Sequence, residues 1–382
     1  MRIAFDAKRA FHNQTGLGHY SRSLIQAVAT HFPQHEYFLC NPKPSALFPL
    51  RENNLHEVLP TTFWAKKFSS LWRSGGIKKD LARLKIDLYH GLSHEIPRGI
   101  HKTNIKSVVT IHDLIHERYP EQYSAIDVRV YRHKFRYACA NADAIIAISE
   151  QTKRDIIDFY NIPEKKIRVC YQSCNPIFEK NVSTKEKERV RRMYSLPPKY
   201  FLYVGSIIER KNLLNVLKAL YLLKNKTSTP LVVIGNGKKY KNEVKNYLRE
   251  NQLINRVIFL SENKAASTPE FISSAVFPAL YQMATAMVYP SSFEGFGIPV
   301  LEALWSRLPV ITSNTSCLPE AGGPSSYYIT PTSPQEIATA MERIENDILL
   351  AKKMADAGLK YAANFTSAKS AAAVMQVYED SI

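Results

Sequence analysis

The sequence lacks any run of 18 or more apolar residues, the length that a membrane-spanning helix requires. Its first residues, MRIAFDAKRAF, enter a strand-like pattern at once, so we expect no signal peptide. Cysteine is scarce, and no second cysteine pair or histidine cluster completes a zinc site with Cys170 and Cys174. These shortages favour a cytoplasmic protein with reduced thiols and no metal centre.

Acidic residues are also in short supply, with 34 Asp and Glu against 51 Lys and Arg, which gives a net charge of +17. Such an excess predicts attraction to phosphates in nucleic acid, an anionic bilayer or nucleotide substrates, and it also fits a surface charged for solubility. The 382 residues, 45% of them hydrophobic, exclude general disorder and suit two domains.

Two halves of the chain open alike, each with a buried strand, a loop and an amphipathic helix, beginning at Arg2 and at Tyr200. Further apolar strands are expected at 86–91, 107–113, 143–149, 166–172, 230–235, 256–261, 284–290 and 308–313. Apolar strands that alternate with helices predict two doubly wound α/β domains with parallel sheets. We expect these domains at 1–178 and 195–365, with a last helix at 366–382 that packs on the first.

The stretch FEGFGIPVLEAL follows the expected strand at 284–290. Pro299 suits the first turn of a helix, so the helix is expected to begin near Ile298. Gly295 and Gly297 allow the backbone to approach a ligand and to aim N–H groups at an anion. Because ligands of open parallel sheets bind beyond the carboxyl ends of the strands, this loop is expected to line a cleft where the two domains face each other.

Two carboxylates, Glu294 and Glu302, lie on either side of this anion-binding bend. A carboxylate accepts two neighbouring hydroxyls, which sugars and riboses carry. The arrangement suits a nucleotide sugar, with glycine amides near the diphosphate and one glutamate on each ring. A helix whose first turn simply carries favourable carboxylates is the alternative.

A basic pair, Arg210 and Lys211, follows the strand YFLYVGS. At a strand's carboxyl end these cations can neutralise a diphosphate and stabilise it as a leaving group. A surface basic pair is the alternative, since this chain is rich in lysine and arginine.

The segment TGLGHYS lies between the first strand and the first long helix, where Gly16 and Gly18 permit backbone approach to a phosphate. Ser21 stands where the third glycine of the dinucleotide-binding fingerprint belongs, which weakens a dehydrogenase interpretation. A third polar group, His112 with Asp113, ends the strand SVVTI and could bond a sugar hydroxyl or accept a proton.

Taken together, these residues resemble the retaining glycosyltransferases of family 4, which have the GT-B fold. The most specific feature is the E-x7-E pattern in FEGFGIPVLE. The segments that occur in the same order as in the family are TGLGHY, TIHDL, ISEQTKRDI, YVGSIIERKN and TSNTSCLPE.

The resemblance implies a role for each motif. Glu294 would bind the transferred sugar and Glu302 the nucleotide ribose, while His112 would contact the sugar near the acceptor. The remaining donor contacts implied are Gly16, Gly18, Ser206, Arg210, Lys211, Gly295, Phe296, Gly297 and Ile298, with His112, Asp113 and Glu294 as catalytic residues. No cofactor and no metal are implied.

The implied reaction moves a hexose from a nucleotide-diphospho sugar, with GDP-mannose favoured, to a glycan or lipid-linked acceptor of surface polysaccharide synthesis. The chain departs from the family at Ser206, where many members have arginine, and at 261–271, where a glycine-containing turn is usual. A nucleotide-sugar epimerase or another GT-B enzyme is the nearest alternative. A nucleic-acid-binding protein, suggested by the charge, is more remote because the basic residues are spread along the chain.

The segment 61–85 combines large apolar side chains with cations, namely Phe63, Trp64, Phe68, Leu71 and Trp72 with Lys66, Lys67, Arg73, Lys78 and Lys79. One interpretation is peripheral contact with an anionic bilayer, at the inner face of the cell membrane, that carries the acceptor. The other is an ordinary helix whose aromatic residues belong to the core.

Overall fold

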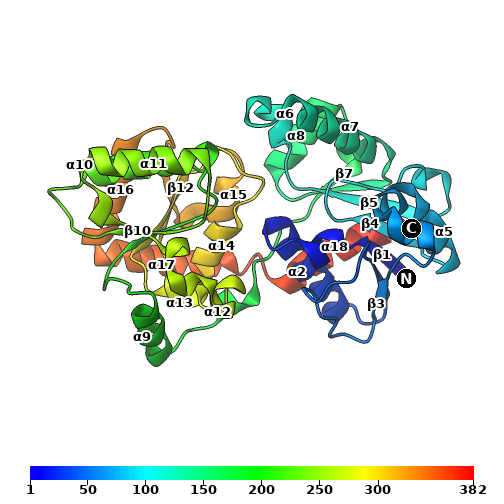
Figure 1. The fold of residues 1–382 in the computed structure, drawn as a ribbon, viewed down its shortest axis with the longest axis horizontal. Helices are drawn as coiled ribbons and strands as arrows, with labels where there is room; N and C mark the ends of the chain where they lie inside the picture. Colours follow the sequence, from blue (N-terminus) through cyan, green and yellow to red (C-terminus); the bar gives the residue numbers. More distant parts are fainter. The chain divides into compact units, whose positions relative to one another are not determined.

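The computed structural model describes all 382 residues and divides them into two compact units (Figure 1). Unit 1 contains residues 1–173 and 365–382, and unit 2 contains residues 174–364. None of the helices combines the length and apolarity that crossing a bilayer requires.

Unit 1 is built on seven parallel strands in the order β3-β2-β1-β4-β5-β6-β7. Their bounds are β1 Arg2–Asp6, β2 Glu36–Cys40, β3 Leu55–Val58, β4 Leu88–Gly91, β5 Lys106–Ile111, β6 Ala144–Ala147 and β7 Ile167–Val169. The chain moves outward from β1 to β3 and then returns to β4 on the other side of β1. The strand order therefore reverses between β1 and β4, which is where open α/β sheets place ligands.

Unit 2 repeats the design with six parallel strands in the order β10-β9-β8-β11-β12-β13. Their bounds are β8 Phe201–Val204, β9 Leu231–Ile234, β10 Val257–Phe259, β11 Ala286–Tyr289, β12 Val310–Ser313 and β13 Tyr327–Ile329. Here the strand order reverses between β8 and β11. The basic pair follows β8 and the FEGFG loop follows β11, so neighbouring strands end at these two motifs.

Helices cover both faces of each sheet. In unit 1 they are α1 Lys8–His12, α2 Gly16–His31, α3 Phe63–Lys67, α4 Ser69–Leu71, α5 Lys78–Arg83, α6 Ile115–Arg118, α7 Ala125–Asn141, α8 Glu150–Tyr160 and α18 Ser367–Glu379. In unit 2 they are α9 Thr184–Met193, α10 Leu213–Leu222, α11 Lys239–Glu250, α12 Pro269–Ile272, α13 Phe277–Gln282, α14 Ile298–Trp305, α15 Leu318–Gly322, α16 Pro334–Asn346 and α17 Ile348–Ala362.

Successive residues of β1 show how the sheet is buried on both sides. Ile3 and Phe5 belong to one apolar cluster, which includes residues of α2 and α18. Ala4 between them belongs to a second cluster, which includes residues of α7 and α8. A strand buried on both faces is the mark of a doubly wound parallel sheet, and the predicted fold class is confirmed.

The last helix, α18, packs on unit 1 beside α2 (Figure 1). Its Tyr378 hydroxyl lies 2.6 Å from Nδ1 of the buried His90 on β4. Nε2 of His90 lies 2.8 Å from the hydroxyl of Thr110 on β5. These hydrogen bonds connect the last helix to the central strands β4 and β5 of the first sheet.

Candidate donor site

In unit 2, the loop after β11 and the 3₁₀ turn after β8 (η6, Glu209–Lys211) are bonded to each other. The backbone N–H and the hydroxyl of Ser292 both donate to the carbonyl of Arg210, at 2.9 and 3.1 Å. The guanidinium of Arg210 donates in return to the carbonyl of Phe293. Two motifs far apart in the sequence are therefore hydrogen-bonded to each other.

Glu294 is buried, and its carboxylate is held by four groups. Its Oε1 atom lies 2.5 Å from Nζ of Lys211 and 3.3 Å from the guanidinium of Arg210. The same oxygen accepts hydrogen bonds from Ser291 at 2.5 Å and from Tyr289 at 3.1 Å. All four contacts are made by Oε1, so Oε2 keeps its capacity to accept hydrogen bonds.

The charges around Glu294 decide its ionisation. Burial alone would raise the pKa of this carboxyl, but Lys211 and Arg210 outweigh burial and hold the pKa at about 2. Burial lowers the pKa of Lys211, and Glu294 opposes that change. Glu294 is therefore a carboxylate in contact with two cations, and Glu294, Arg210 and Lys211 together carry one net positive charge.

Helix α14 begins at Ile298 with proline in its first turn, as predicted. Gly297 precedes it with φ of 118°, a conformation that favours glycine. A Cβ at this position would also come within 3.1 Å of Leu318. The N–H groups of Gly297 and Ile298 have no acceptor within the chain, so they form a helix N-terminus open to an anion.

Glu302 lies one turn into α14, in different surroundings. It is partly buried, and its Oε2 accepts a hydrogen bond of 2.7 Å from Tyr281 on α13. Burial raises the pKa of Glu302 to about 7, against the effect of that hydrogen bond. Glu294 is therefore ionised at neutral pH, whereas the pKa of Glu302 lies close to neutral pH.

In unit 1, the TGLGHY and TIHD motifs meet. His112 lies just past the end of β5, buried, with its ring edge-on to Tyr20 of α2 at 4.5 Å. Its Nε2 donates to the carbonyl of Leu92 at 2.9 Å, which leaves Nδ1 as the acceptor of a neutral ring. Burial lowers the pKa of His112 to about 4, so the ring is neutral near pH 7. The Asp113 carboxylate accepts the N–H of Ile115 at 3.1 Å.

The two glycines of TGLGHY lie in the first turn of α2, where a loop was expected. A Cβ on Gly18 would come 1.8 Å from the backbone oxygen of Asn13, so this glycine lets α2 pack on the end of α1. The Gly18 N–H bonds to the Asn13 side chain at 3.2 Å. Gly16 faces open space, so of the two only Gly16 is unconstrained by packing.

Ser206, the remaining predicted donor contact, is exposed after β8. The turn after β9 packs closely against the backbone of the preceding residue, Gly205. A Cβ on Gly235 would lie 1.8 Å from the Gly205 oxygen, and one on Gly237 would lie 2.1 Å from the Ile207 oxygen. The Gly-x-Gly turn at 235–237 is therefore explained by tight packing.

Two family models match the chain, one for each unit. The model described as Glycosyltransferase Family 4 matches residues 15–176, and the model described as Glycosyl transferases group 1 matches residues 184–361. The protein is a GT-B glycosyltransferase.

Relatives agree with this assignment. The glycosyltransferase is 27% identical over 371 residues to O-antigen chain mannosyltransferase B of Escherichia coli, with 91% of each chain covered. Its fold resembles a glycosyltransferase from Rickettsia africae, with a TM-score of 0.75, 18% identity and coverage of 99% and 98%. It also resembles HepE of Anabaena in complex with UDP and glucose, with a TM-score of 0.73, 16% identity and both chains fully covered at 100%.

Sequence reasoning missed several residues of the glycosyltransferase that contact Glu294, Glu302 and the FEGFG loop after β11. Besides Tyr281, Tyr289 and Ser291, they include two residues of the loop after β12. The hydroxyl of Ser316 accepts the N–H of Glu294 at 3.2 Å. The thiol of Cys317 bonds the carbonyls of Glu294 and Phe296, each at 3.0 Å. The motif TSNTSCLPE follows β12, which pairs with β11, so it lies beside the FEGFG loop. Its position after a predicted strand was the only sign in the sequence that these residues belong to the site.

Proposed function

We propose that this glycosyltransferase moves a hexose, with mannose from GDP-mannose favoured, onto a glycan or lipid-linked acceptor of bacterial surface polysaccharide synthesis. The mannose and polysaccharide assignments rest on the relative named as an O-antigen mannosyltransferase and on the family resemblance of the motifs. The observation that carries the proposal is Glu294, a buried carboxylate held through one oxygen by two cations beside an open helix N-terminus.

The donor is proposed to bind through complementary charges. Arg210, Lys211 and the amides of Gly297 and Ile298 would neutralise the diphosphate, since one positive charge remains after Glu294 is paired. Oε2 of Glu294 would accept sugar hydroxyls. Glu302 would accept the two ribose hydroxyls, and Ser206, Gly295 and Phe296 complete the proposed donor contacts.

The proposed reaction retains the anomeric configuration. The bond from C1 of the hexose to the diphosphate oxygen breaks, and the acceptor oxygen bonds to C1 on the same face. The acceptor's proton passes to the departing phosphate, whose charge Arg210 and Lys211 stabilise. These two buried cations supply the electrostatic help that a metal ion gives elsewhere, and we propose that no metal is needed.

The unit 1 residues are proposed to contact the donor or the acceptor. His112 would accept a sugar hydroxyl at Nδ1, because a ring with a pKa of about 4 is a poor proton donor near pH 7. Gly16, with open space around it, would allow a phosphate to approach. Asp113 and Gly18 stay in the proposed set, although the side chain of Asp113 caps a turn and the amide of Gly18 bonds to Asn13.

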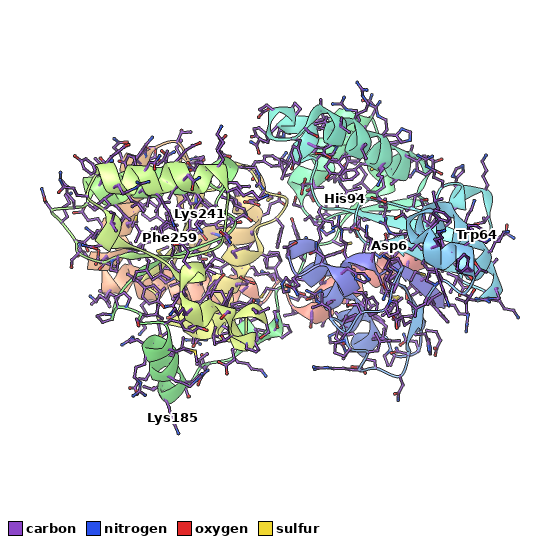
Figure 2. The ribbon with its side chains drawn as sticks, in the orientation of Figure 1. Asp6, Trp64, His94, Lys185, Lys241 and Phe259 are labelled. Carbon is purple, nitrogen blue, oxygen red and sulfur yellow. The ribbon has the colours of Figure 1, made fainter.

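Segment 61–85 is proposed to touch an anionic bilayer at the inner face of the membrane. The alternative that its aromatic residues are core holds only for Trp72, which is buried, whereas Phe63, Trp64 and Phe68 are 70%, 66% and 45% exposed and the neighbouring Leu71 is 68% exposed. We call these four side chains the apolar patch, and Figure 2 shows Trp64 on the surface of unit 1. Lys66 and Lys67 lie among them, so apolar and cationic groups face outward together.

A donor screen tests the proposed function. GDP-mannose, UDP-glucose, UDP-galactose and dTDP-rhamnose are offered with a bacterial lipid-linked glycan acceptor, and release of nucleoside diphosphate and glycan extension are measured, with and without EDTA. The proposal expects acceptor-dependent transfer from GDP-mannose that EDTA leaves intact. Isomerisation of a donor without transfer would identify an epimerase, and loss of activity that Mg²⁺ or Mn²⁺ restores would end the metal-free mechanism.

A further inference from the structure

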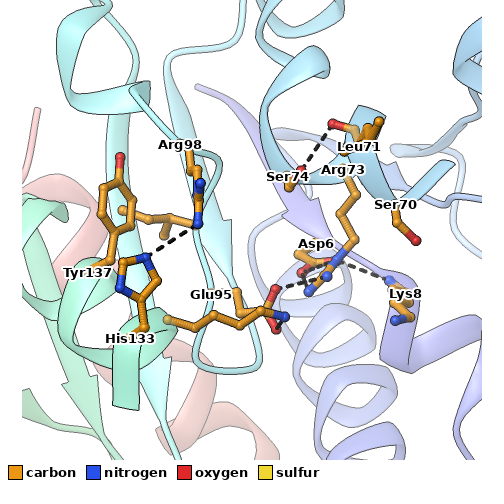
Figure 3. Close-up of a pocket in the computed structure, with 12 residues that line it drawn as sticks. Asp6, Lys8, Ser70, Leu71, Arg73, Ser74, Glu95, Arg98, His133 and Tyr137 are labelled. Atoms are coloured by element: carbon orange, nitrogen blue, oxygen red, sulfur yellow. Dashed lines mark hydrogen bonds and ion pairs between the residues drawn. The ribbon is translucent and has the colours of Figure 1, made fainter. Parts of the chain in front are cut away.

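Unit 1 contains a cavity of about 430 Å³ at the carboxyl ends of β1 and β4 (Figure 3). This is where the strand order of the first sheet reverses, so the fold provides a crevice there. The walls come from the residues after β1, the π-helical turn Trp72–Gly76, the loop after β4 and helix α7. None of the residues in the donor motifs lines it.

Arg73 is the central group of this cavity. Its Nε and one terminal nitrogen donate hydrogen bonds to the buried carboxylate of Asp6 at 2.9 and 2.6 Å. The other terminal nitrogen donates to Glu95 at 3.0 Å. Figure 3 shows the guanidinium between the two carboxylates. Three of its five N–H groups are thus used, and the guanidinium is fixed with two donors to spare.

Cations exceed carboxylates around Arg73. Four cationic side chains line the cavity, Lys8, Arg73, Arg98 and Lys134, against the two carboxylates of Asp6 and Glu95. The ammonium group of Lys8 has no hydrogen-bond or ion-pair partner in the structure, and burial followed by the charge of Arg73 lowers its pKa. An adjoining cavity of about 250 Å³ shares Lys8 and Arg73 and adds Lys43.

This charge pattern selects an anion. Both carboxylates are committed to Arg73, with Glu95 also 3.1 Å from Lys134, so they are poorly placed to accept sugar hydroxyls. A group with several anionic oxygens could take the spare Arg73 donors together with the ammonium of Lys8 and the guanidinium of Arg98. Phosphate and diphosphate groups fit that description.

The surroundings indicate what carries the phosphate. Leu71, which lines the cavity, also belongs to the apolar patch with Phe63, Trp64 and Phe68. The rings of Trp64 and Phe68 stack at 6.0 Å, and Lys67 lies over both. An amphiphile with a diphosphate head and a hydrocarbon chain matches a cationic cavity that continues into exposed apolar side chains.

We propose that this cavity binds the diphosphate of a lipid-linked acceptor, while the apolar patch contacts its hydrocarbon chain. The proposal rests on the proposed function for the existence of such an acceptor. It deepens that function by naming the diphosphate lipid as the acceptor class and by assigning its recognition to Lys8, Arg73 and Arg98.

Binding is measured by calorimetry without a donor sugar, so the outcome does not depend on catalysis. The probes are geranyl diphosphate, inorganic pyrophosphate, geraniol and phosphatidylglycerol vesicles, with saturating GDP present to occupy the donor site. The double variant Lys8→Gln/Arg98→Gln removes two of the proposed contacts. Lys102→Gln, an exposed lysine of unit 1 outside the cavity, is the matched control, and thermal melting verifies that each variant folds.

We expect geranyl diphosphate to bind, pyrophosphate to compete with it, and geraniol not to bind. The double variant should weaken geranyl diphosphate binding at least tenfold, with the Lys102→Gln control unchanged. Equal binding by the double variant and the wild type, or equal binding of geraniol, would overturn the site. Binding to vesicles alone would overturn the acceptor assignment and favour bilayer headgroups. A protein that binds the diphosphate lipid but transfers no sugar would refute only the proposed function.

Discussion

Replacing Lys211 with methionine removes the nearest cation from Glu294 and keeps the side chain's length. In the wild type, the pKa of Glu294 is about 2 instead of the ordinary 4.5. A shift of this size corresponds to about 3 kcal/mol of preference for the carboxylate, because each pKa unit is about 1.4 kcal/mol. The variant leaves a buried carboxylate with Arg210 alone at 3.3 Å.

Breaking a buried pair from one side costs about 3–5 kcal/mol of stability. We expect Lys211→Met to lower the free energy of unfolding by an amount near the lower end of that range, since Arg210 remains. Transfer should fall by about 100-fold or more, because the proposed site would lose one of the two cations that stabilise the leaving diphosphate. Urea unfolding and steady-state kinetics with GDP-mannose measure the two effects.

The double variant Lys211→Met/Glu294→Gln separates stability from activity. Removing both charges should recover part of the lost stability, since the buried carboxylate is gone and Arg210 keeps its hydrogen bond to the carbonyl of Phe293, while transfer stays lost. The reasoning is refuted if Lys211→Met unfolds like the wild type, or if the neutral pair recovers transfer.

Three further predictions concern other parts of the molecule. The folded state raises the pKa of Glu302 from 4.5 to about 7, so the stability that its protonated carboxyl contributes is complete below pH 4.5 and is lost as the pH rises through 7. Relative to Glu302→Gln, the free energy of unfolding of the wild type should fall by at most about 3 kcal/mol between pH 4.5 and 8, as measured by urea titrations. Gly18→Ala should destabilise by about 1–3 kcal/mol through overpacking, whereas Gly16→Ala should be near neutral, and equal melting temperatures would contradict this packing. Replacing Trp64 and Phe68 with serine should reduce sedimentation with phosphatidylglycerol vesicles without changing the melting temperature, and unchanged sedimentation would exclude the apolar patch as the contact.

Much of the fold could be predicted because its central strands are continuous apolar runs. The strands that escaped prediction are β2, β3 and β13. β3 is an edge strand, LHEV, with polar residues at its centre, and β13 is an edge strand of three residues, YYI. Proteins keep edge strands short or polar, which prevents pairing with another chain, so the apolar pattern of these strands is weak.

The residues of the FEGFG loop after β11 could be singled out from the sequence, but their contacts could not. Glu294 and Lys211 could each be assigned a role from the motifs. Their ion pair depends on β8 lying next to β11, and strand order cannot be read from periodicity. The same holds for Lys211 and Tyr289, which are hydrogen-bonded although 78 residues apart in the sequence.

The cavity of unit 1 could not be predicted at all. Asp6 ends a predicted strand, and Arg73 lies in a segment whose aromatic residues suggested either core or membrane contact. Only the π-helical turn at Trp72–Gly76 and the parallel pairing of β1 with β4 bring Arg73 to Asp6 and Glu95. A three-way contact between segments distant in sequence leaves no periodic signal.

The most direct test of the central claim is a crystal structure with GDP-2-deoxy-2-fluoromannose, a donor whose transfer is slowed. We expect the diphosphate to lie against Arg210, Lys211 and the N-terminus of α14, with Oε2 of Glu294 within hydrogen-bond distance of the hexose hydroxyls. A diphosphate bound elsewhere, or a Glu294 carboxylate that makes no contact with the hexose, would contradict it.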